Sequence, residues 1–394
     1  MEAVWSIQSS LQRHRNICQL RSAFLTWRGA VTCPTMAAWK GIIHAYGDRM
    51  NISKSVAPVT LCEGNTPLIP LPKLAGLIAP GAELFAKFEG LNPTGSFKDR
   101  GMTTAITQSV ADGAQTVICA STGNTAAAAA AYAARAGQTC VVLIPDGKIA
   151  LGKLAGAIAY GARVIAIDGS FDAALRMVRE VSDRAPIALV NSVNPARLEG
   201  QKTAAWEVCE QLGGFPDWLC LPVGNAGNIS SYWMGFSECP GPCRCEVCPR
   251  PNRKPQLLGA QAAGAAPLVT GLPCPNPETR ATAIRIGAPA RADQALTAIR
   301  ESNGQMLAVT DEEIFRAYHL VAETEGVFCE PSSAAGLAGL NQAVQNGTLN
   351  PEGKRIVCVL TGHGLKDPDS AVAERADIQK VEANVDALLR GLNL

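Results

Sequence analysis

The sequence lacks several features that would place it in other classes of protein. Among 394 residues, 35 Lys and Arg balance 34 Asp and Glu, so the net charge of +1 provides no field that favours nucleic acid or an anionic membrane. No apolar run approaches the roughly 18 residues that a membrane span needs. Charged residues at 18% and hydrophobic residues at 47% exclude a largely disordered chain. We therefore expect a soluble, cytoplasmic protein of enzyme size, with neither a nucleic-acid nor a membrane partner.

The 14 cysteines do not have the dense spacing of a secreted disulfide scaffold. Ten are scattered through apolar segments and are typical of small buried side chains in a reducing compartment. The other four lie within residues 239–248, spaced C-x₃-C-x-C-x₂-C among five prolines that exclude a helix. This knot is too short for paired zinc knuckles, so we interpret residues 237–255 as a surface loop or a reading-frame error, and we predict no metal site.

Residues 1–36 differ in composition from the rest of the chain. They contain several arginines and serines but only one acid, Glu2, which is the composition of an organelle transit peptide. No hydrophobic region of a secretory signal is present in them. We interpret the segment as a disordered extension, or as the product of an upstream start with Met36 as the true initiator.

Short β-branched segments alternate with Ala-rich helical segments along most of the chain. Strands are expected at 116–120, 140–144, 164–167, 187–190, 218–221, 306–309 and 355–360. Helices are expected at 124–136, 151–160, 171–184, 200–212, 311–325 and 332–345. This α/β alternation predicts two doubly wound parallel-sheet domains, at residues 37–197 and 198–394, whose ligands bind at the carboxyl ends of strands.

Two loops in the first half of the chain carry candidate functional groups. In EGLNPTGSFKDRG, a Pro-Gly turn delivers Lys98 beside Phe97 to the start of a helix, where burial lowers the pKa of an amine and frees it for imine chemistry. In ASTGNT, four small polar residues surround the start of a helix, which is more than an N-cap requires. The free N–H groups at that helix end predict a carboxylate pocket.

Two further loops lie in the second half. PVGNAGN follows a strand and precedes a helix, so its consecutive N–H groups can hold a phosphate. It does not match G-x-G-x-x-G, and dinucleotide binding is therefore not indicated. TGHGLKD, residues 361–367, directly follows the strand expected at 355–360. Residues 147–154 match the first seven positions of a P-loop, but Leu154 cannot offer the hydroxyl that Mg²⁺ needs.

Together these loops resemble the threonine synthase family of fold-type-II pyridoxal-phosphate enzymes. The matching stretches are EGLNPTGSFKDRG, ASTGNT, NSVNPARLEGQKTAAWE, PVGNAGNI, QAAGAAPLV, TAIRIGAPA, EGVFCEPSSAA and TGHGLKD. They run in family order over most of the chain, and the ordered set is far more specific than any one of them. The resemblance implies a tryptophan-synthase-β-like fold, with pyridoxal 5'-phosphate in the cleft between the two domains, and a homodimer.

The resemblance also implies roles for the matching residues. The cofactor would be bound by Lys98, Asn124, Gly224, Asn225, Ala226, Gly227, Asn228 and Thr361. Among these, Lys98 would hold it covalently and act catalytically, Asn124 would bond its phenolic oxygen, and Thr361 would bond its pyridine nitrogen. The substrate would be bound by Ser121, Thr122, Thr125, Asn191, Ser192 and Arg197. The first three would take its carboxylate, and the last three, with Thr125, would take its phosphate.

The implied reaction is that of a carbon–oxygen lyase, which converts O-phospho-L-homoserine and water into L-threonine and phosphate. The planar fork of Arg197 suits a phosphate group. Two alternatives remain open at this stage. One is a related fold-type-II enzyme, either a threonine or serine dehydratase or a β-replacement enzyme, which needs no second phosphate site. The other is a catalytically silent cofactor-binding protein.

Overall fold

The computed structural model describes residues 38–146, 151–169, 171–239, 253–375 and 379–392. The predicted extension at 1–36 and nearly all of the cysteine cluster lie outside these ranges. Lys40–Leu394 forms one compact unit that contains two β-sheets. None of the helices in the described ranges is both long and apolar enough to cross a bilayer.

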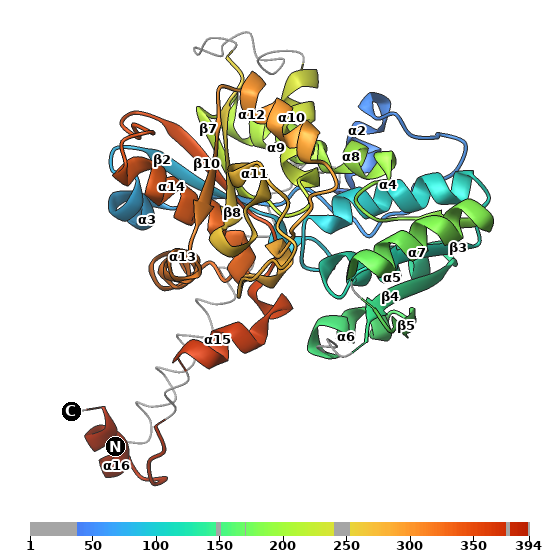
Figure 1. The fold of residues 1–394 in the computed structure, drawn as a ribbon. Coiled ribbons are helices and arrows are strands. Elements are labelled where there is room, and N and C mark those ends of the chain that lie inside the picture. The colour runs from blue at the N-terminus through green and yellow to red at the C-terminus, as the bar shows by residue number, and fades with distance from the viewer. Residues whose placement is uncertain (1–37, 147–150, 170, 240–252, 376–378, 393–394) are drawn as a thin grey trace, which may run out of the picture. The chain divides into compact units, whose positions relative to one another are not determined.

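The larger sheet has six strands in the order β1-β2-β10-β7-β8-β9 (Figure 1). Their bounds are Leu68–Pro70, Glu83–Phe88, Arg355–Leu360, Trp218–Pro222, Gln256–Ala262 and Gln305–Val309. Only the short edge strand β1 is antiparallel to its neighbour among these described strands. The register pairs Cys358 with both Ala86 of β2 and Cys220 of β7, at the centre of the sheet.

The smaller sheet has four strands, all parallel, in the order β5-β4-β3-β6. Their bounds are Arg163–Ile167, Thr139–Pro145, Thr116–Ala120 and Ile187–Leu189. Because β1 and β2 belong to the larger sheet, the two sheets do not separate at residue 197 of the chain. The exact domain boundary stays a prediction.

Helices cover both faces of each sheet, as the doubly wound pattern requires (Figure 1). On the larger sheet, α3 (Pro72–Ile78), α13 (Asp311–Glu325) and α14 (Ala335–Gln345) cover one face, and α9 (Thr203–Leu212), α10 (Gly227–Glu238) and α12 (Ala292–Glu301) cover the other. On the smaller sheet, α4 (Lys98–Ala111), α5 (Asn124–Ala136) and α6 (Leu151–Ala159) lie opposite α7 (Phe171–Arg184). The prediction of the α/β fold is confirmed.

The remaining described α-helices are α2 (Ile42–Tyr46), α8 (Pro195–Gln201), α11 (Pro267–Thr270), α15 (Pro368–Arg375) and α16 (Val385–Gly391).

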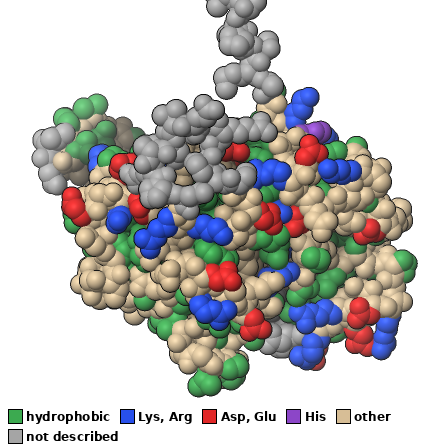
Figure 2. Space-filling model, turned by 90° about the horizontal axis from the view of Figure 1, so that it is seen from above, with side chains coloured by type: hydrophobic (Ala, Val, Ile, Leu, Met, Phe, Trp, Pro, Cys, Tyr) green, Lys and Arg blue, Asp and Glu red, His purple; other side chains and the backbone are tan. Residues whose placement is uncertain are grey.

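The surface seen in Figure 2 carries acidic and basic side chains interspersed, in keeping with the balanced charge of the sequence. We find no single-sign patch on that face.

Most predicted elements agree with the observed ones to within a residue or two. The strand at 116–120 and the helices at 124–136, 171–184 and 311–325 have the predicted bounds. The prediction of one helix at 200–212 is wrong at its start, because α8 ends at Gln201 and α9 begins at Thr203. The predicted helix at 332–345 begins as a 3₁₀ turn, Pro331–Ala334, before α14.

A buried network of charges joins the two layers beneath the loop that carries Lys98. Arg100 of α4 donates from Nε to Glu89 at 2.7 Å and from both terminal nitrogens to Glu207 of α9, each at 2.7 Å. Lys87 of β2 donates to the same Glu207 at 2.8 Å and to the carbonyl oxygen of Thr66 at 2.6 Å. The four side chains are all buried, and their charges sum to zero.

The pKa of Glu207 shows the strength of this network. Burial alone raises the pKa of a carboxyl group, yet the positive charges of Arg100 and Lys87 hold the pKa of Glu207 at about 2. Each charge therefore depends on its partners, because removal of one leaves an uncompensated ion in the interior.

We expect Arg100→Met to lower the free energy of unfolding by about 3–5 kcal/mol, because it leaves two buried carboxylates facing one lysine. Urea unfolding at pH 7 measures the effect. The control is Arg184→Met, which breaks an exposed ion pair with Glu180 on α7 and should cost roughly 0.3–0.5 kcal/mol. Equal losses in the two variants would contradict a structural role for the network.

Candidate active site

The loop that carries Lys98 lies against the loop that follows β10. Ser96 and Gly362 form an antiparallel bridge. The amide of Phe97 donates to the carbonyl oxygen of Thr361 at 2.9 Å, and that of His363 donates to Gly95 at 2.9 Å. Gly95 has a φ of 84°, a conformation that favours glycine and turns the chain into α4. The backbone therefore fixes Lys98 at the carboxyl ends of the strands of the larger sheet.

Lys98 is the first residue of α4, and its amine lies 4.4 Å from the centre of the Phe97 ring. Burial and then the positive charge of Arg197 lower the pKa of this amine to about 7, against an opposing effect of the Glu330 carboxylate. A neutral, nucleophilic amine is therefore far more accessible near neutral pH than it is in an ordinary lysine.

Thr361 and Ser333 form a pair of hydroxyl groups beside this loop. Their oxygens are 2.9 Å apart, and the Ser333 hydroxyl also accepts from the amide of Gly362 at 3.0 Å. Both side chains are buried. A hydroxyl at position 361 can bond a ring nitrogen without carrying a charge of its own.

Asn124, the first residue of α5, contacts a carboxylate that comes from the other layer. Its amide nitrogen donates to the two carboxylate oxygens of Glu330 at 3.1 and 3.0 Å. A Cβ on Gly362 would lie 2.5 Å from the same carboxylate, so only glycine leaves room for it. Burial raises the pKa of Glu330, although Asn124 and the ammonium group of Lys366 oppose the shift.

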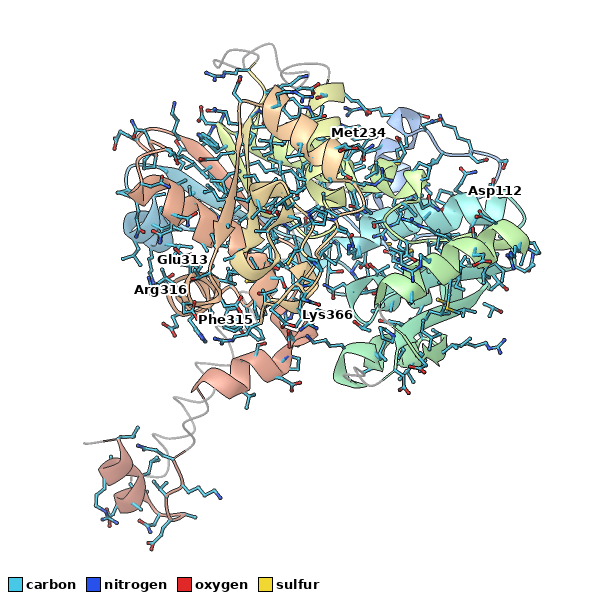
Figure 3. The ribbon with its side chains drawn as sticks, in the orientation of Figure 1. Asp112, Met234, Glu313, Phe315, Arg316 and Lys366 are labelled. Atoms are coloured by element: carbon cyan, nitrogen blue, oxygen red, sulfur yellow. The ribbon has the colours of Figure 1, made fainter. Side chains whose placement is uncertain are left out.

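Lys366, labelled in Figure 3, follows the Thr361 loop and donates to the carbonyl oxygen of Thr94 at 3.2 Å. Burial lowers the pKa of its ammonium group, and the charges of Glu330 and Asp99 oppose that shift. This lysine adds a second cation close to the Lys98 loop.

The loop of Ser121, Thr122 and Thr125 joins β3 to α5. All three residues are partly buried, and no side chain caps the helix at Gly123. The amide of Gly123 donates back to the Ser121 hydroxyl at 3.2 Å. The first N–H groups of α5 and the three hydroxyls lie together at this helix start, and their role in binding a carboxylate stays a prediction.

Residues 224–228 comprise the end of the connection from β7 to α10 and the first two residues of α10. Ala226 adopts a φ of 64°, which reverses the chain just before the helix begins. The side-chain amide nitrogen of Asn228 is buried and has no hydrogen-bond partner in the described part of the chain. Around Gly227, a Cβ would find only Arg291 and Gln201 atoms, each at 4.0 Å. Such a loop of N–H groups at a helix N-terminus, with an unpaired donor beside it, suits a phosphate.

The loop after β6 contains Asn191 and Ser192, and Arg197 lies in the first turn of α8, which follows it. The side chain of Asn191 forms two hydrogen bonds with the backbone of Ala120, accepting at 2.9 Å and donating at 3.0 Å, so it ties β6 to the end of β3. Arg197 is 1% exposed and donates once, from Nη1 to the carbonyl oxygen of Val190 at 3.2 Å.

The other two nitrogens of Arg197, Nε and Nη2, have no hydrogen-bond partner among the described residues. Burial of this kind, without a carboxylate beside it, lowers the pKa of the guanidinium to about 10. In the described part of the chain Arg197 forms no ion pair. A buried cation with free donors is the expected chemistry of an anion site.

The sequence reasoning missed three residues of this region: Gln201, Arg291 and Glu330. Glu330 lies within the matching stretch EGVFCEPSSAA, and Arg291 directly follows the matching stretch TAIRIGAPA. Neither pattern indicates which residue each side chain contacts. Gln201 has a buried side-chain oxygen with no partner. Their contacts come from distant parts of the chain, and the sequence carries no signal for such pairs.

Comparisons with known proteins find relatives over most of the chain. The profile of the pyridoxal-phosphate dependent enzymes matches residues 59–362. The chain is 57% identical over 342 residues to the threonine synthase of Synechocystis sp., covering 86% of this chain and 87% of the relative. It is 53% identical over 361 residues to the threonine synthase of Mycobacterium tuberculosis, covering 91% and 98%.

Among solved structures, maize serine racemase superposes with a TM-score of 0.66 at 23% identity, covering 79% of this chain and 91% of that one. That likeness concerns the fold. Together with the coverage of the family profile and the identity to the two relatives, the findings show that the chain belongs to the threonine synthase family of pyridoxal-phosphate dependent enzymes.

Proposed function

We propose that this protein converts O-phospho-L-homoserine and water into L-threonine and phosphate, with pyridoxal 5'-phosphate as its cofactor. The observation that carries the proposal is the surrounding of Lys98. This partly buried amine has a pKa of about 7 and is influenced by the buried, unpaired guanidinium of Arg197. The phosphate-type loop at residues 224–228 is a separate anion site.

The residues present fit the cofactor. Asn228 offers a buried amide donor without a partner, and the loop from Gly224 to Asn228 presents its N–H groups at a helix N-terminus. Lys98 would hold the cofactor covalently, Asn124 would bond its phenolic oxygen, and Thr361 would bond its ring nitrogen. When bound, pyridoxal phosphate withdraws electrons from the carbon atoms of the substrate next to its amino group.

The substrate has two anionic ends, and the site offers a place for each. We assign its carboxylate to the start of α5, with Ser121, Thr122 and Thr125. We assign its phosphate to Ser192 and Arg197, helped by Thr125. The amide of Asn191 is engaged with Ala120, so we give it the task of holding the loop, with its remaining N–H toward the phosphate.

Lys98 supplies the proton transfers in this proposal. An amine with a pKa of about 7 can accept a proton from carbon and return it at neutral pH, which an ordinary lysine does poorly. Thr361 is uncharged and would not hold a proton on the ring nitrogen of a bound cofactor as a carboxylate would, so more of the proton transfer falls on Lys98. Glu330 positions the amide of Asn124.

We also propose that the protein is a homodimer in the cytoplasm, with the two sheets as its two domains and the substrate as its small-molecule partner. The support is the family membership and the doubly wound arrangement of the two sheets. A dehydratase of related fold remains the second candidate, but it has no use for the unpaired donors of Arg197.

We expect Lys98→Ala to lose at least about a thousandfold in turnover of O-phospho-L-homoserine, because no other amine stands at this position. Release of inorganic phosphate and formation of L-threonine are measured together. The variant should also lack the visible absorption of the covalently held cofactor. Normal turnover in Lys98→Ala would overturn the mechanism. Formation of 2-oxobutyrate from L-threonine at a higher rate by the wild type would favour the dehydratase.

The pKa of Lys98 predicts how covalent attachment of the cofactor depends on pH. The neutral amine is the nucleophile, and it predominates above the pKa of about 7. We therefore expect the rate of attachment to cofactor-free protein to rise through pH 7 and to level off above it. A lysine with an ordinary pKa would give a rate that still rises at pH 9. Stopped-flow absorbance distinguishes the two.

We expect Glu330→Gln to keep the contact with Asn124 but to remove a negative charge that raises the pKa of Lys98. The midpoint of the attachment profile should therefore move to lower pH, and kcat should fall about tenfold. The matched control is Glu312→Gln on the exposed side of α13, which should change neither. An unmoved midpoint in Glu330→Gln would show that this carboxyl group does not act on Lys98.

A further inference from the structure

Arg291 connects the two layers of the site by its side chain. It lies just before α12, beside the larger sheet, and reaches the turn that follows β6 of the smaller sheet. Its Nε donates to the carbonyl oxygen of Ser192 at 2.8 Å, and its Nη2 donates to that of Val193 at 3.0 Å. Nη1 donates to Gln294 on its own helix at 2.8 Å. The planar guanidinium thus bonds two consecutive carbonyl groups of one turn.

The rest of that turn is held by other contacts. Asn191 bonds the backbone of Ala120, and the side chain of Asn194 accepts from Ala196 at 2.9 Å at the start of α8. Ser192 and Val193 are the two residues between these anchors. Arg291 therefore supplies the hydrogen bonds that fix the backbone at the residue assigned to the substrate phosphate.

The same short segment also contacts the loop at residues 224–228. The amide of Ala290 donates to the side-chain oxygen of Asn225 at 3.4 Å, and the Cδ of Arg291 lies 4.0 Å from the Cβ position of Gly227. Residues 290 and 291 thus adjoin both phosphate-type loops, although neither resembles a phosphate-binding motif.

The charges point to an anion between the two arginines. The positive charge of Arg291 is near enough to contribute, after burial, to the lowered pKa of the Arg197 guanidinium. Neither forms an ion pair with any carboxylate of the residues that the structure describes. Two partly or fully buried guanidinium groups that repel each other are stabilised when an anion binds between them. A dianionic phosphate monoester has the charge and the acceptor oxygens for this place.

We propose that Arg291 is a specificity-determining positioning residue for the phosphate of the substrate, which it serves by fixing the Ser192–Val193 turn and by adding positive charge beside Arg197. The inference rests on the assignment of O-phospho-L-homoserine as substrate. Arg291 acts on recognition of the phosphate group, and it leaves the binding of the amino-acid part and of the cofactor to other residues.

The test compares Arg291→Met and Arg291→Lys with the wild-type holoenzyme. Methionine keeps the length of the apolar stem, and lysine keeps the charge but cannot bond two carbonyl groups in one plane. We expect Arg291→Met to raise the KM for O-phospho-L-homoserine and the inhibition constant of inorganic phosphate about tenfold, with kcat changed less than threefold. Arg291→Lys should recover part of the loss.

Calorimetric titration with L-homoserine, which lacks the phosphate, should give the same affinity in wild type and variants. The affinity for the cofactor and the thermal midpoint should also stay the same. Arg300→Met, an exposed arginine on α12, is the matched control for loss of one charge and should behave as the wild type.

Equal losses for L-homoserine and for the phosphorylated substrate, or a lower thermal midpoint, would show a merely structural role and overturn the proposal. An unchanged KM in Arg291→Met would also overturn it. If the wild type itself neither turns over O-phospho-L-homoserine nor is inhibited by phosphate, the proposed function fails first, and that outcome is distinct.

Discussion

The position of Lys98 depends on the buried guanidinium of Arg100, two residues further along the same helix. Arg100 belongs to α4 of the smaller layer, whereas its partners Glu89 and Glu207 belong to the larger layer. The ionic contact between the layers therefore lies within one turn of the reactive amine. A buried ion pair is weak evidence for net stability, but it constrains geometry strongly. Here it fixes the position at which α4 begins.

Glycine allows the helices around this network to approach closely. A Cβ on Gly200 of α8 would lie 1.8 Å from the carbonyl oxygen of Arg100, and one on Gly101 would lie 3.1 Å from Nε of Arg197. A side chain at Gly200 would clash with the backbone of α4, so this crossing of α4 and α8 requires glycine there. The charge network and the close crossing of α4 and α8 together bring the Arg197 guanidinium near Lys98, and this proximity contributes to the low pKa of the amine.

Three further polar contacts join the layers around Lys98, and each uses a residue that no motif assigns. Glu330 meets Asn124, Arg291 meets the turn at Ser192, and Lys153 donates to Thr282 at 2.6 Å and to Asp367 at 2.9 Å. Lys153 stands in the segment that resembles a P-loop. Its ammonium group is engaged with the opposite layer, which gives this lysine a role other than nucleotide binding.

The sequence predicts the alternating elements well, because periodic apolar residues and Gly stops are local signals. Gly137, for example, ends α5 with a φ of 70°. The sequence does not predict that β2 pairs with β10, because nothing in residues 83–88 indicates a partner strand about 270 residues away. Nor does it predict that the ammonium group of Lys202, at the break between α8 and α9, bonds Glu238 of α10 at 2.7 Å.

The site residues divide in the same way. The sequence identifies candidates that lie in motifs, such as Lys98 and Thr361, because the residues of each motif are contiguous in the chain. Asn191 was assigned to phosphate, yet its side chain is largely engaged with Ala120. A polar residue in a strand-end loop can either bind a ligand or hold the loop, and the sequence pattern around it does not distinguish the two roles. Only the contacts of the folded chain decide between them.

The nearly neutral chain can bind a doubly anionic substrate and an anionic cofactor because its cations act over short distances. Exposed charges are screened beyond about 10 Å, whereas buried ones are screened much less. Among the described residues Arg197 is buried with two free donors, the N-terminal ends of α5 and α10 present N–H groups, and Arg291 adds charge beside the Ser192 turn. Selectivity for phosphorylated amino acids therefore requires no excess of basic residues, only the removal of carboxylates from the surroundings of a few buried donors.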